Sequence, residues 1–305
     1  MGKRVLNSFA SDFAKMNKTE LLQAMAESEG RTLMTECIGF FTPQCEDVTN
    51  AELCAAFGSD FILCNIFDVW NPDIKGLPSH EAVDTARLMK KYTGLPIGIN
   101  LEPGEIVEGS DNPWALTKGR VANAENAIRA RDMGIDLILI TGHPGIGVTN
   151  EGILKAIREI KEAVGDDVII ASGKMHAAGV IGEGADAILT MKDIDAFAEA
   201  GADVILLPAP GTVPGITLDW AVQRVNRIHQ LGKLAMTAIG TSQEGTDEET
   251  IKQIALLCKQ TGADIHHIGD SGHPGIAAPK NIMAYSIAIR GIRHTYHRMA
   301  ASINR

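Results

Sequence analysis

Two histidines in this sequence lie in the same local setting. The five residues Gly-His-Pro-Gly-Ile occur at 142–146 and again at 272–276, so His143 and His273 lie 130 residues apart in identical surroundings. Each copy follows an apolar run and precedes a helical pattern, which places it on a loop between a strand and a helix. A neutral imidazole can transfer protons near pH 7, so both histidines are candidate proton shuttles. The alternative is a rigid turn in which each histidine hydrogen-bonds its own loop.

A lysine and two acids are the other candidates for catalysis. Lys174 is the only lysine directly after a predicted strand, where partial loss of hydration could make its amine a base or a Schiff-base nucleophile. Pairing with a substrate anion and simple solvation in a loop are its alternative roles. Glu36 could orient the substrate or bind a metal ion, and Asp270 could point inward as an acid or a base.

Further polar side chains stand where other predicted strands end. The candidates for substrate binding are Asn65, Asn100, Glu102, Thr141 and His176. Glu36, Asp68 and Glu102 could converge on Mg²⁺ or Mn²⁺, since hard cations prefer oxygen ligands. No spacing typical of a metal site links these carboxylates, so hydrogen bonding to a polyhydroxylated substrate is favoured. A metal site with Asp68 and Glu102 as candidate ligands is the alternative.

Glycine-rich segments follow the last two predicted strands, where barrels of this kind often bind phosphate. The candidate phosphate-binding residues are Gly240, Thr241, Ser242, Ser271 and Gly272. Glycines let backbone amides approach an anion, hydroxyls add donors, and the next helix contributes its positive end. The alternative is that these glycines only permit tight turns. Asp270 counts against phosphate, because a carboxylate repels a dianion.

The elements that must position these residues alternate regularly. Apolar stretches predict strands at 32–38, 61–66, 96–101, 136–141, 168–172, 203–207, 234–239 and 264–268. Helical patterns are found at 50–57, 79–92, 117–133, 150–164, 193–200, 217–231, 247–261 and from residue 280 onward. Strands with little polar alternation are typical of a parallel sheet covered by helices. We predict an α/β fold, one (β/α)8 TIM barrel over residues 1–305, with its chemistry at the carboxyl ends of the strands.

Three details refine this architecture. Residues 1–30 form an N-terminal extension in which Asn17 and Glu20 have the spacing of a capping box, which predicts a short helix on the barrel floor. The repeated pentapeptide predicts an internal twofold repeat, since 130 residues correspond to four βα units of roughly 30 to 35 residues each. His266 and His267 are adjacent in the last strand, so one faces the barrel interior and the other faces the helices.

Composition excludes several classes of protein. The net charge of −10 and the absence of Lys/Arg blocks argue against nucleic acid as a partner. The apolar runs are far shorter than the roughly 20 residues needed to span a bilayer, so no membrane is expected. The five cysteines have no metal-type spacing, which favours reduced thiols in a cytoplasmic protein. A homo-oligomer remains open.

Three families share parts of this pattern. The glycine-rich turns after strands four and eight resemble the phosphate-binding half-barrels of histidine-biosynthesis isomerases. That family's paired aspartates correspond in place to Glu36 and Lys174, so the resemblance implies architecture rather than its reaction. Segments 58–68, 96–100 and 174–177 resemble BtpA-like barrels, which are associated with photosystem assembly. The strand-two segment is also similar to phosphoenolpyruvate mutase and ketopantoate hydroxymethyltransferase barrels, metal-assisted enzymes of enolate chemistry, although their acidic metal motif is incomplete here.

The sequence therefore predicts an enzyme that acts on a small phosphorylated metabolite, as a lyase or an isomerase that works through an enolate or enamine. A metal-dependent hydrolase of a phosphorylated or carboxylated substrate, using the same carboxylates, is the first alternative. A non-catalytic, BtpA-like assembly or regulatory barrel that keeps only the ligand site is the second.

Overall fold

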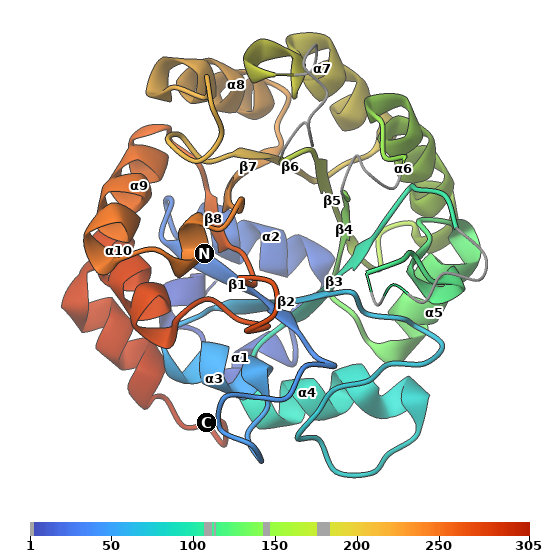
Figure 1. The fold of residues 1–305 in the computed structure, drawn as a ribbon, viewed down its shortest axis with the longest axis vertical. Coiled ribbons are helices and arrows are strands. Elements are labelled where there is room, and N and C mark those ends of the chain that lie inside the picture. Colours follow the sequence, from blue (N-terminus) through green and yellow to red (C-terminus); the bar gives the residue numbers. More distant parts are fainter. Residues whose placement is uncertain (1–2, 107–111, 113, 143–146, 176–183) are drawn as a thin grey trace.

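Eight parallel strands form a closed barrel in the computed structural model, which describes residues 3–106, 112, 114–142, 147–175 and 184–305. Neighbouring strands follow the order of the chain, and the last strand pairs with the first. The strands are β1 (Thr32–Ile38), β2 (Phe61–Asn65), β3 (Ile97–Leu101), β4 (Leu137–Ile140), β5 (Ile169–Gly173), β6 (Val204–Pro208), β7 (Leu234–Ile239) and β8 (Ile265–Ile268). Figure 1 shows the strands inside a ring of helices. The predicted (β/α)8 barrel is confirmed.

The register of the sheet sets which side chains face the barrel interior. Glu36 of β1 lies beside Leu63 of β2, which lies beside Gly98 of β3. Residues at the same level of neighbouring strands face the same side, and the residues between them face the helices. Every residue of β1 is buried, as expected for a strand covered on both faces.

Helices cover the outside of the barrel in the part of the chain that the structure describes. They are α3 (Asn50–Ala56), α4 (Thr85–Thr93), α5 (Ala124–Met133), α6 (Asn150–Val164), α7 (Met191–Ala200), α8 (Leu218–Gln230), α9 (Glu248–Gln260) and α10 (Pro279–Ala300). Two begin later than predicted, because the short 3-10 turns η2 (Ala82–Asp84) and η3 (Lys118–Arg120) precede α4 and α5. Asn123 caps α5 by accepting a hydrogen bond from the Asn126 amide at 2.9 Å, and a capping residue has non-helical backbone.

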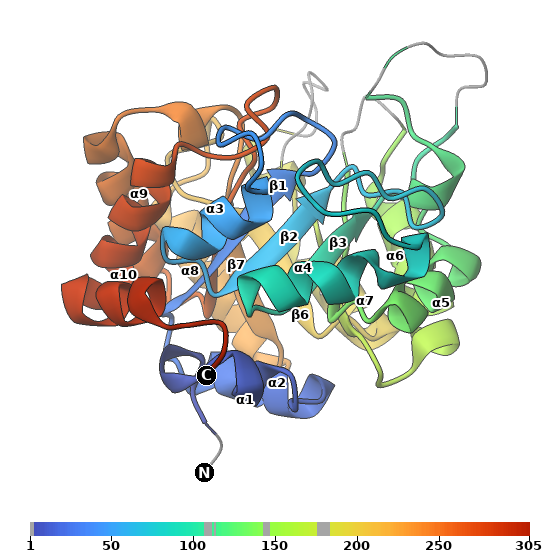
Figure 2. The same cartoon turned by 90° about the horizontal axis from the view of Figure 1, so that it is seen from below.

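The N-terminal segment covers the amino ends of the strands. It contains the 3-10 turn η1 (Val5–Asn7) and the helices α1 (Ala10–Phe13) and α2 (Lys18–Ala26), which lie below the barrel in Figure 2. The Glu20 amide donates to Asn17 Oδ1 and the Asn17 amide donates to Glu20 Oε2, both at 3.0 Å. Lys18 Nζ pairs with the Asp203 carboxylate at 2.8 Å, just before β6. The predicted floor helix with its capping box is confirmed.

A buried network around Asp60 ties the end of the chain to its beginning. Asp60 Oδ2 accepts a hydrogen bond from the Leu33 amide at 2.9 Å and pairs with Arg290. Asp60 Oδ1 accepts from Arg298 Nε at 2.8 Å, and Arg298 Nη2 donates to the Val5 carbonyl at 2.6 Å. The network joins α10 to β1, β2 and the N-terminal segment.

Two further expectations bear on the whole chain. Within the described ranges, none of the helices has both the length and the apolar character needed to cross a membrane. The internal twofold repeat stays a prediction, because residues 143–146 of its first copy at 142–146 fall outside the described residues.

Candidate active site

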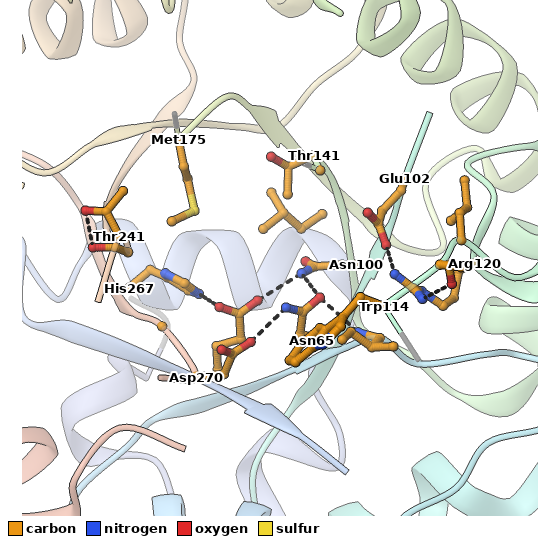
Figure 3. Close-up of a pocket in the computed structure, with 18 of the residues that line it drawn as sticks. Asn65, Asn100, Glu102, Trp114, Arg120, Thr141, Met175, Thr241, His267 and Asp270 are labelled. Carbon is orange, nitrogen blue, oxygen red and sulfur yellow. Dashed lines mark hydrogen bonds and ion pairs between the residues drawn. The ribbon is translucent and has the colours of Figure 1, made fainter. Parts of the chain in front are cut away.

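A cavity of about 690 Å³ lies at the carboxyl-terminal ends of the strands. Eight of the candidates named from the sequence line it: Glu36, Asn65, Asn100, Glu102, Thr141, Gly240, Thr241 and Asp270. The other lining residues are Ile66, Glu105, Asn112, Trp114, Ala115, Leu116, Arg120, Leu139, Gly142, Met175, Glu244, His267 and Gly269. Figure 3 shows many of these side chains around the cavity. The strand ends therefore bring together most of the acids and amides that the sequence singled out.

Two asparagines link two acids across this cavity (Figure 3). Asn100 Nδ2 donates to Glu36 Oε1 at 2.9 Å and to Asn65 Oδ1 at 3.0 Å. Asn65 Nδ2 donates in turn to Asp270 Oδ2 at 2.8 Å. Asp270 Oδ1 accepts a further hydrogen bond from the Gly272 amide at 2.7 Å. The amides thus hold both carboxyl groups in defined orientations.

The two acids differ in their surroundings. Burial raises the pKa of Glu36 well above its ordinary value, and the charge of Asp270 raises it further, although the Asn100 hydrogen bond opposes this. Burial also raises the pKa of Asp270, but hydrogen bonds from Asn65 and Gly272 oppose the increase. Because donors reach both oxygens of Asp270, its ionised form is favoured over that of Glu36. Such a pair suits acid–base chemistry, with Glu36 as the acid and Asp270 as the base.

Glu244 and His267 extend the acidic end of the cavity. Glu244 lies after β7 in the turn η7 (Gln243–Gly245), and burial raises its pKa. His267 Nε2 lies 3.5 Å from Glu36 Oε2, which is long for a hydrogen bond. Burial lowers the pKa of His267 to about 4, so its ring is neutral at pH 7. This end of the cavity therefore combines three carboxyl groups with a neutral imidazole.

A buried ion pair lies on the other side of the two asparagines, as Figure 3 shows. Arg120 Nη2 pairs with Glu102 Oε1, and Arg120 Nη1 donates to the Ala115 carbonyl at 2.9 Å. The Glu102 amide donates to the Arg120 carbonyl at 2.8 Å, and Glu102 bridges to Val121 in a parallel arrangement. The loop after β3 thus returns alongside the strand end and carries Arg120 into the cavity wall.

An aromatic cluster joins three loops beside the cavity. The Trp114 ring lies 5.7 Å from Phe41 and 5.5 Å from His273, and the last two rings lie 5.5 Å apart. These residues follow β3, β1 and β8, so the cluster holds the three loops together. Trp114 lines the cavity, whereas His273 is exposed and lies outside the lining. Its role as a proton shuttle stays a prediction.

The predicted phosphate-binding residues are split between the cavity and its rim. Gly240 and Thr241 line the cavity, while Ser242, Ser271 and Gly272 do not. Thr241, Ser242 and Ser271 have φ values of 60°, 72° and 59°, a left-handed conformation that is unfavourable for residues other than glycine. The surrounding contacts must therefore fix these two turns.

The amides of these turns face acids of the same chain. The Gly272 amide bonds Asp270, and backbone amides of Ser242 and Ser271 oppose the increase in the pKa of Glu244. Carboxyl groups thus take N–H groups that a phosphate would need. This arrangement disfavours a phosphate dianion at the turns, which agrees with the repulsion expected from Asp270.

Lys174 and Asp68 are two further sequence candidates that lie outside the cavity lining. Lys174 follows β5 and is buried, whereas its neighbour Met175 lines the cavity. Asp68 accepts a hydrogen bond from Thr117 Oγ1 at 2.6 Å and another from the Trp70 amide at 2.8 Å, so it fixes the loops after β2 and β3.

Asp68 lies outside the cavity that Glu102 lines, and a cation site shared by the two stays a prediction. Across the described ranges, no group of three or more His, Cys, Asp or Glu side chains is arranged to hold a metal ion. His143 and His176 lie outside the described residues, and their roles stay predictions.

Several cavity residues were not singled out from the sequence. His267 could have been assigned from strand alternation: His266 bonds the Gly30 carbonyl at 2.9 Å and lies near Tyr285 of α10, which leaves His267 facing inward. Glu244 and Arg120 gave no such signal, because each lies on a loop and not at a strand end. Their positions depend on how those loops fold back over the barrel.

The chain is similar to known proteins both in sequence and in structure. The chain is 37% identical to a protein of Actinobacillus pleuropneumoniae serotype 5b (strain L20) named "Putative N-acetylmannosamine-6-phosphate 2-epimerase" over 89 residues, which are 29% of this chain and 33% of the relative. The match thus spans about a third of that relative's length. A Schiff-base-forming fructose-1,6-bisphosphate aldolase is 15% identical with a TM-score of 0.57, covering 89% of this chain and 99% of that one. A 2,3-dimethylmalate lyase is 14% identical with a TM-score of 0.49, covering 86% of this chain and 81% of that one.

The structural likeness to the aldolase shows the barrel fold alone. The family model described as "Domain of unknown function (DUF7916)" matches residues 6–305, and the chain therefore belongs to the DUF7916 family.

Proposed function

We propose that this protein is an isomerase or lyase that acts on a small hydroxylated carbonyl metabolite through an enolate. The observation that carries the proposal is a pair of acids, the buried Glu36 and the half-buried Asp270, held by Asn100 and Asn65 at the mouth of the barrel. Their surroundings favour a protonated Glu36 beside an ionised Asp270. Enolate formation needs both groups, a base at carbon and an acid at oxygen.

Each acid has a defined part in the proposed reaction. Asp270 removes the proton from the carbon next to the substrate carbonyl, and the C–H electron pair forms the enolate double bond. The protonated Glu36 donates its hydrogen bond to the carbonyl oxygen as negative charge develops there. In an isomerase the proton returns to carbon, and in a lyase an adjacent C–C bond breaks or forms. A fixed donor at the developing oxyanion supplies much of the acceleration of such reactions.

The sequence relative supports the isomerase form of the proposal. It is named as an epimerase of N-acetylmannosamine 6-phosphate. Inversion at a carbon next to a carbonyl needs a proton to be removed from one face and a proton to be delivered to the other, and we assign the first half, removal at carbon with a hydrogen bond at oxygen, to Asp270 and Glu36. The phosphoryl group in that name agrees with the phosphorylated substrate expected from the sequence, and we keep such substrates in the proposal.

Solvent deuterium exchange tests the proposal directly. The purified protein is incubated in D2O with aldoses, ketoses, amino sugars and their phosphates, and ¹H NMR follows loss of the proton next to the carbonyl. We expect at least one compound to exchange, and Asp270→Asn to slow the exchange by about 10²- to 10⁴-fold. Glu199→Gln, which changes an exposed carboxylate on α7, serves as the matched control and is expected to keep full activity.

The same preparation separates the alternatives. Borohydride trapping of substrate on Lys174 would replace the enolate route by an enamine. Loss of activity with a chelator and recovery with Mg²⁺ or Mn²⁺ would favour the metal-dependent hydrolase. Absence of exchange across the whole panel would overturn the proposal and favour the non-catalytic, BtpA-like reading.

A further inference from the structure

The acidic end of the cavity contains buried polar atoms that lack hydrogen-bond partners among the described residues. They are Asn100 Oδ1, Glu244 Oε2 and both ring nitrogens of His267. All three side chains line the cavity, and their exposed fractions are only 5%, 5% and 0%. Leaving a buried polar atom unpaired is unfavourable, so these atoms are expected to be paired by ordered water or by a ligand that replaces it.

The unpaired oxygen of Asn100 follows from the hydrogen bonds that its amide already makes. Asn100 Nδ2 donates to Glu36 and to Asn65, which uses both of its hydrogens. Its carbonyl oxygen is then left as an acceptor on the cavity side of this network. Asn65 Oδ1 has no such capacity left, because it accepts from Asn100 Nδ2 and from the Ile66 amide, while Asn65 Nδ2 donates one of its two hydrogens to Asp270.

The unpaired set offers both acceptors and a donor. Asn100 Oδ1 only accepts, while a neutral imidazole has one nitrogen that donates and one that accepts. The carboxyl oxygen of Glu244 accepts when the acid is ionised. A hydroxyl group matches such a mixed set, since it donates and accepts at once. An ammonium group only donates, and a phosphate dianion only accepts, so each would leave part of the set unpaired.

The turns beside this end also disfavour an anion. Gly272 already donates its amide to Asp270 at 2.7 Å, and the carboxyl of Glu244 lies near Gly269, 3.7 Å from where a side chain on that glycine would begin. Two acids thus stand where the sequence placed a phosphate group. A neutral part of the ligand fits this end without charge repulsion.

We propose that Asn100, Glu244 and His267 form a subsite for the hydroxylated carbon chain of the substrate, and that they bind its vicinal hydroxyl groups in preference to a phosphoryl or amino group. The inference rests on the proposed function in taking this cavity as the substrate site. It goes further by stating that the hydroxylated part of the substrate lies beside β3, β7 and β8.

Non-reactive probes test the subsite without any turnover. Isothermal titration calorimetry and saturation-transfer NMR compare ribitol, 1,5-pentanediol, 1,5-diaminopentane and inorganic phosphate on the full-length protein. Ribitol has vicinal hydroxyls and no acidic C–H, whereas pentanediol has the same length with only terminal hydroxyls. We expect ribitol to bind about tenfold or more tightly than pentanediol, because the latter loses the paired hydrogen bonds.

A pair of variants locates the binding. Glu244→Gln keeps the size of the side chain and is expected to weaken ribitol binding by about threefold to tenfold. Glu249→Gln, an exposed carboxylate on α9, is the matched control and is expected to leave ribitol binding unchanged. Far-UV circular dichroism of both variants verifies that they are folded before binding is compared.

Other outcomes of the binding experiment overturn the inference. Tighter binding of the diamine would identify a cation site, and phosphate binding that depends on Glu244 would restore the anion site. Equal binding of ribitol and pentanediol, or no ribitol binding, would remove the hydroxyl subsite. Ribitol binding without deuterium exchange by any carbonyl compound would contradict the proposed function and leave this inference standing. Exchange of compounds without vicinal hydroxyls would contradict this inference and leave the proposed function standing.

Discussion

Glu36→Gln is expected to make the protein more stable at neutral pH while it removes activity. The folded state raises the pKa of Glu36 above its value in the unfolded chain, mainly through burial. At pH values below the unfolded pKa, roughly 4.3, both states are protonated and Glu36 has no pH-dependent cost. As the pH rises above that value, the unfolded chain ionises first, so stability falls until the folded pKa is reached.

The substitution removes this penalty at little structural cost. Glutamine keeps the length of the side chain, and its carbonyl oxygen can still accept the hydrogen bond that Asn100 donates at 2.9 Å. A buried polar group in unfavourable surroundings costs about 1–3 kcal/mol, so we expect the variant to gain about that much at pH 8. The gain is expected to shrink toward zero near pH 4. Loss of the acid is expected to lower kcat by about 10²- to 10⁴-fold.

Urea unfolding at pH 4, 6 and 8, followed by circular dichroism, measures the stability difference. The deuterium-exchange assay measures the activity of the same samples. Glu199→Gln is the control for a neutralised carboxylate at the surface, and we expect no comparable gain in stability from it. A variant that is less stable than the parent at pH 8, or that keeps full activity, would show that Glu36 is a structural ion and not the proposed acid.

Three further changes probe other parts of the fold. Asp60→Asn leaves Arg290 and Arg298 without their buried counter-ion, so we expect urea unfolding to show that the free energy of unfolding falls by about 3–5 kcal/mol. A smaller decrease would contradict the burial of this network. Because burial lowers the pKa of His267 to about 4, its ring is expected to show no titration in NMR spectra between pH 5.5 and 8. Thr241 has a left-handed backbone with φ 60°, which costs about 1–2 kcal/mol. Thr241→Gly removes this cost, but the flexibility of glycine in the unfolded chain offsets part of it. We therefore expect thermal unfolding to show an increase in stability of up to about 1 kcal/mol.

The strands were predictable because each is buried on both faces. Such strands are continuous apolar runs, and β1 and β7 span the residues predicted for them, 32–38 and 234–239. Helix starts were less predictable, since they depend on a cap and on the turn before it. α4 begins at Thr85 and not at 79 because the turn η2 comes first.

The site was predictable where a side chain belongs to a strand end. Glu36, Asn65 and Asn100 are fixed by the register of the sheet, so their convergence follows from the fold alone. Arg120 is different, because it reaches the cavity only when the loop after β3 returns and pairs beside Glu102. That return depends on contacts between distant residues, which no local pattern in the sequence records.

The turns after β7 and β8 show where the sequence alone stops being informative. Glycine-rich turns at these strand ends offer amides to an anion, and the sequence shows the amides without showing which acceptor they bond. Here the acceptors belong to the chain: Gly272 donates to Asp270, and Glu244 is turned inward beside Gly269. The same turn chemistry that would cradle a phosphate group instead fixes two acids at the end of the cavity. If the hydroxyl subsite is correct, the specificity of this barrel depends on Asp270 and Glu244, because their carboxyl groups occupy the place that an anion would take. Asn100 and His267 can then contact a neutral chain of hydroxyl groups.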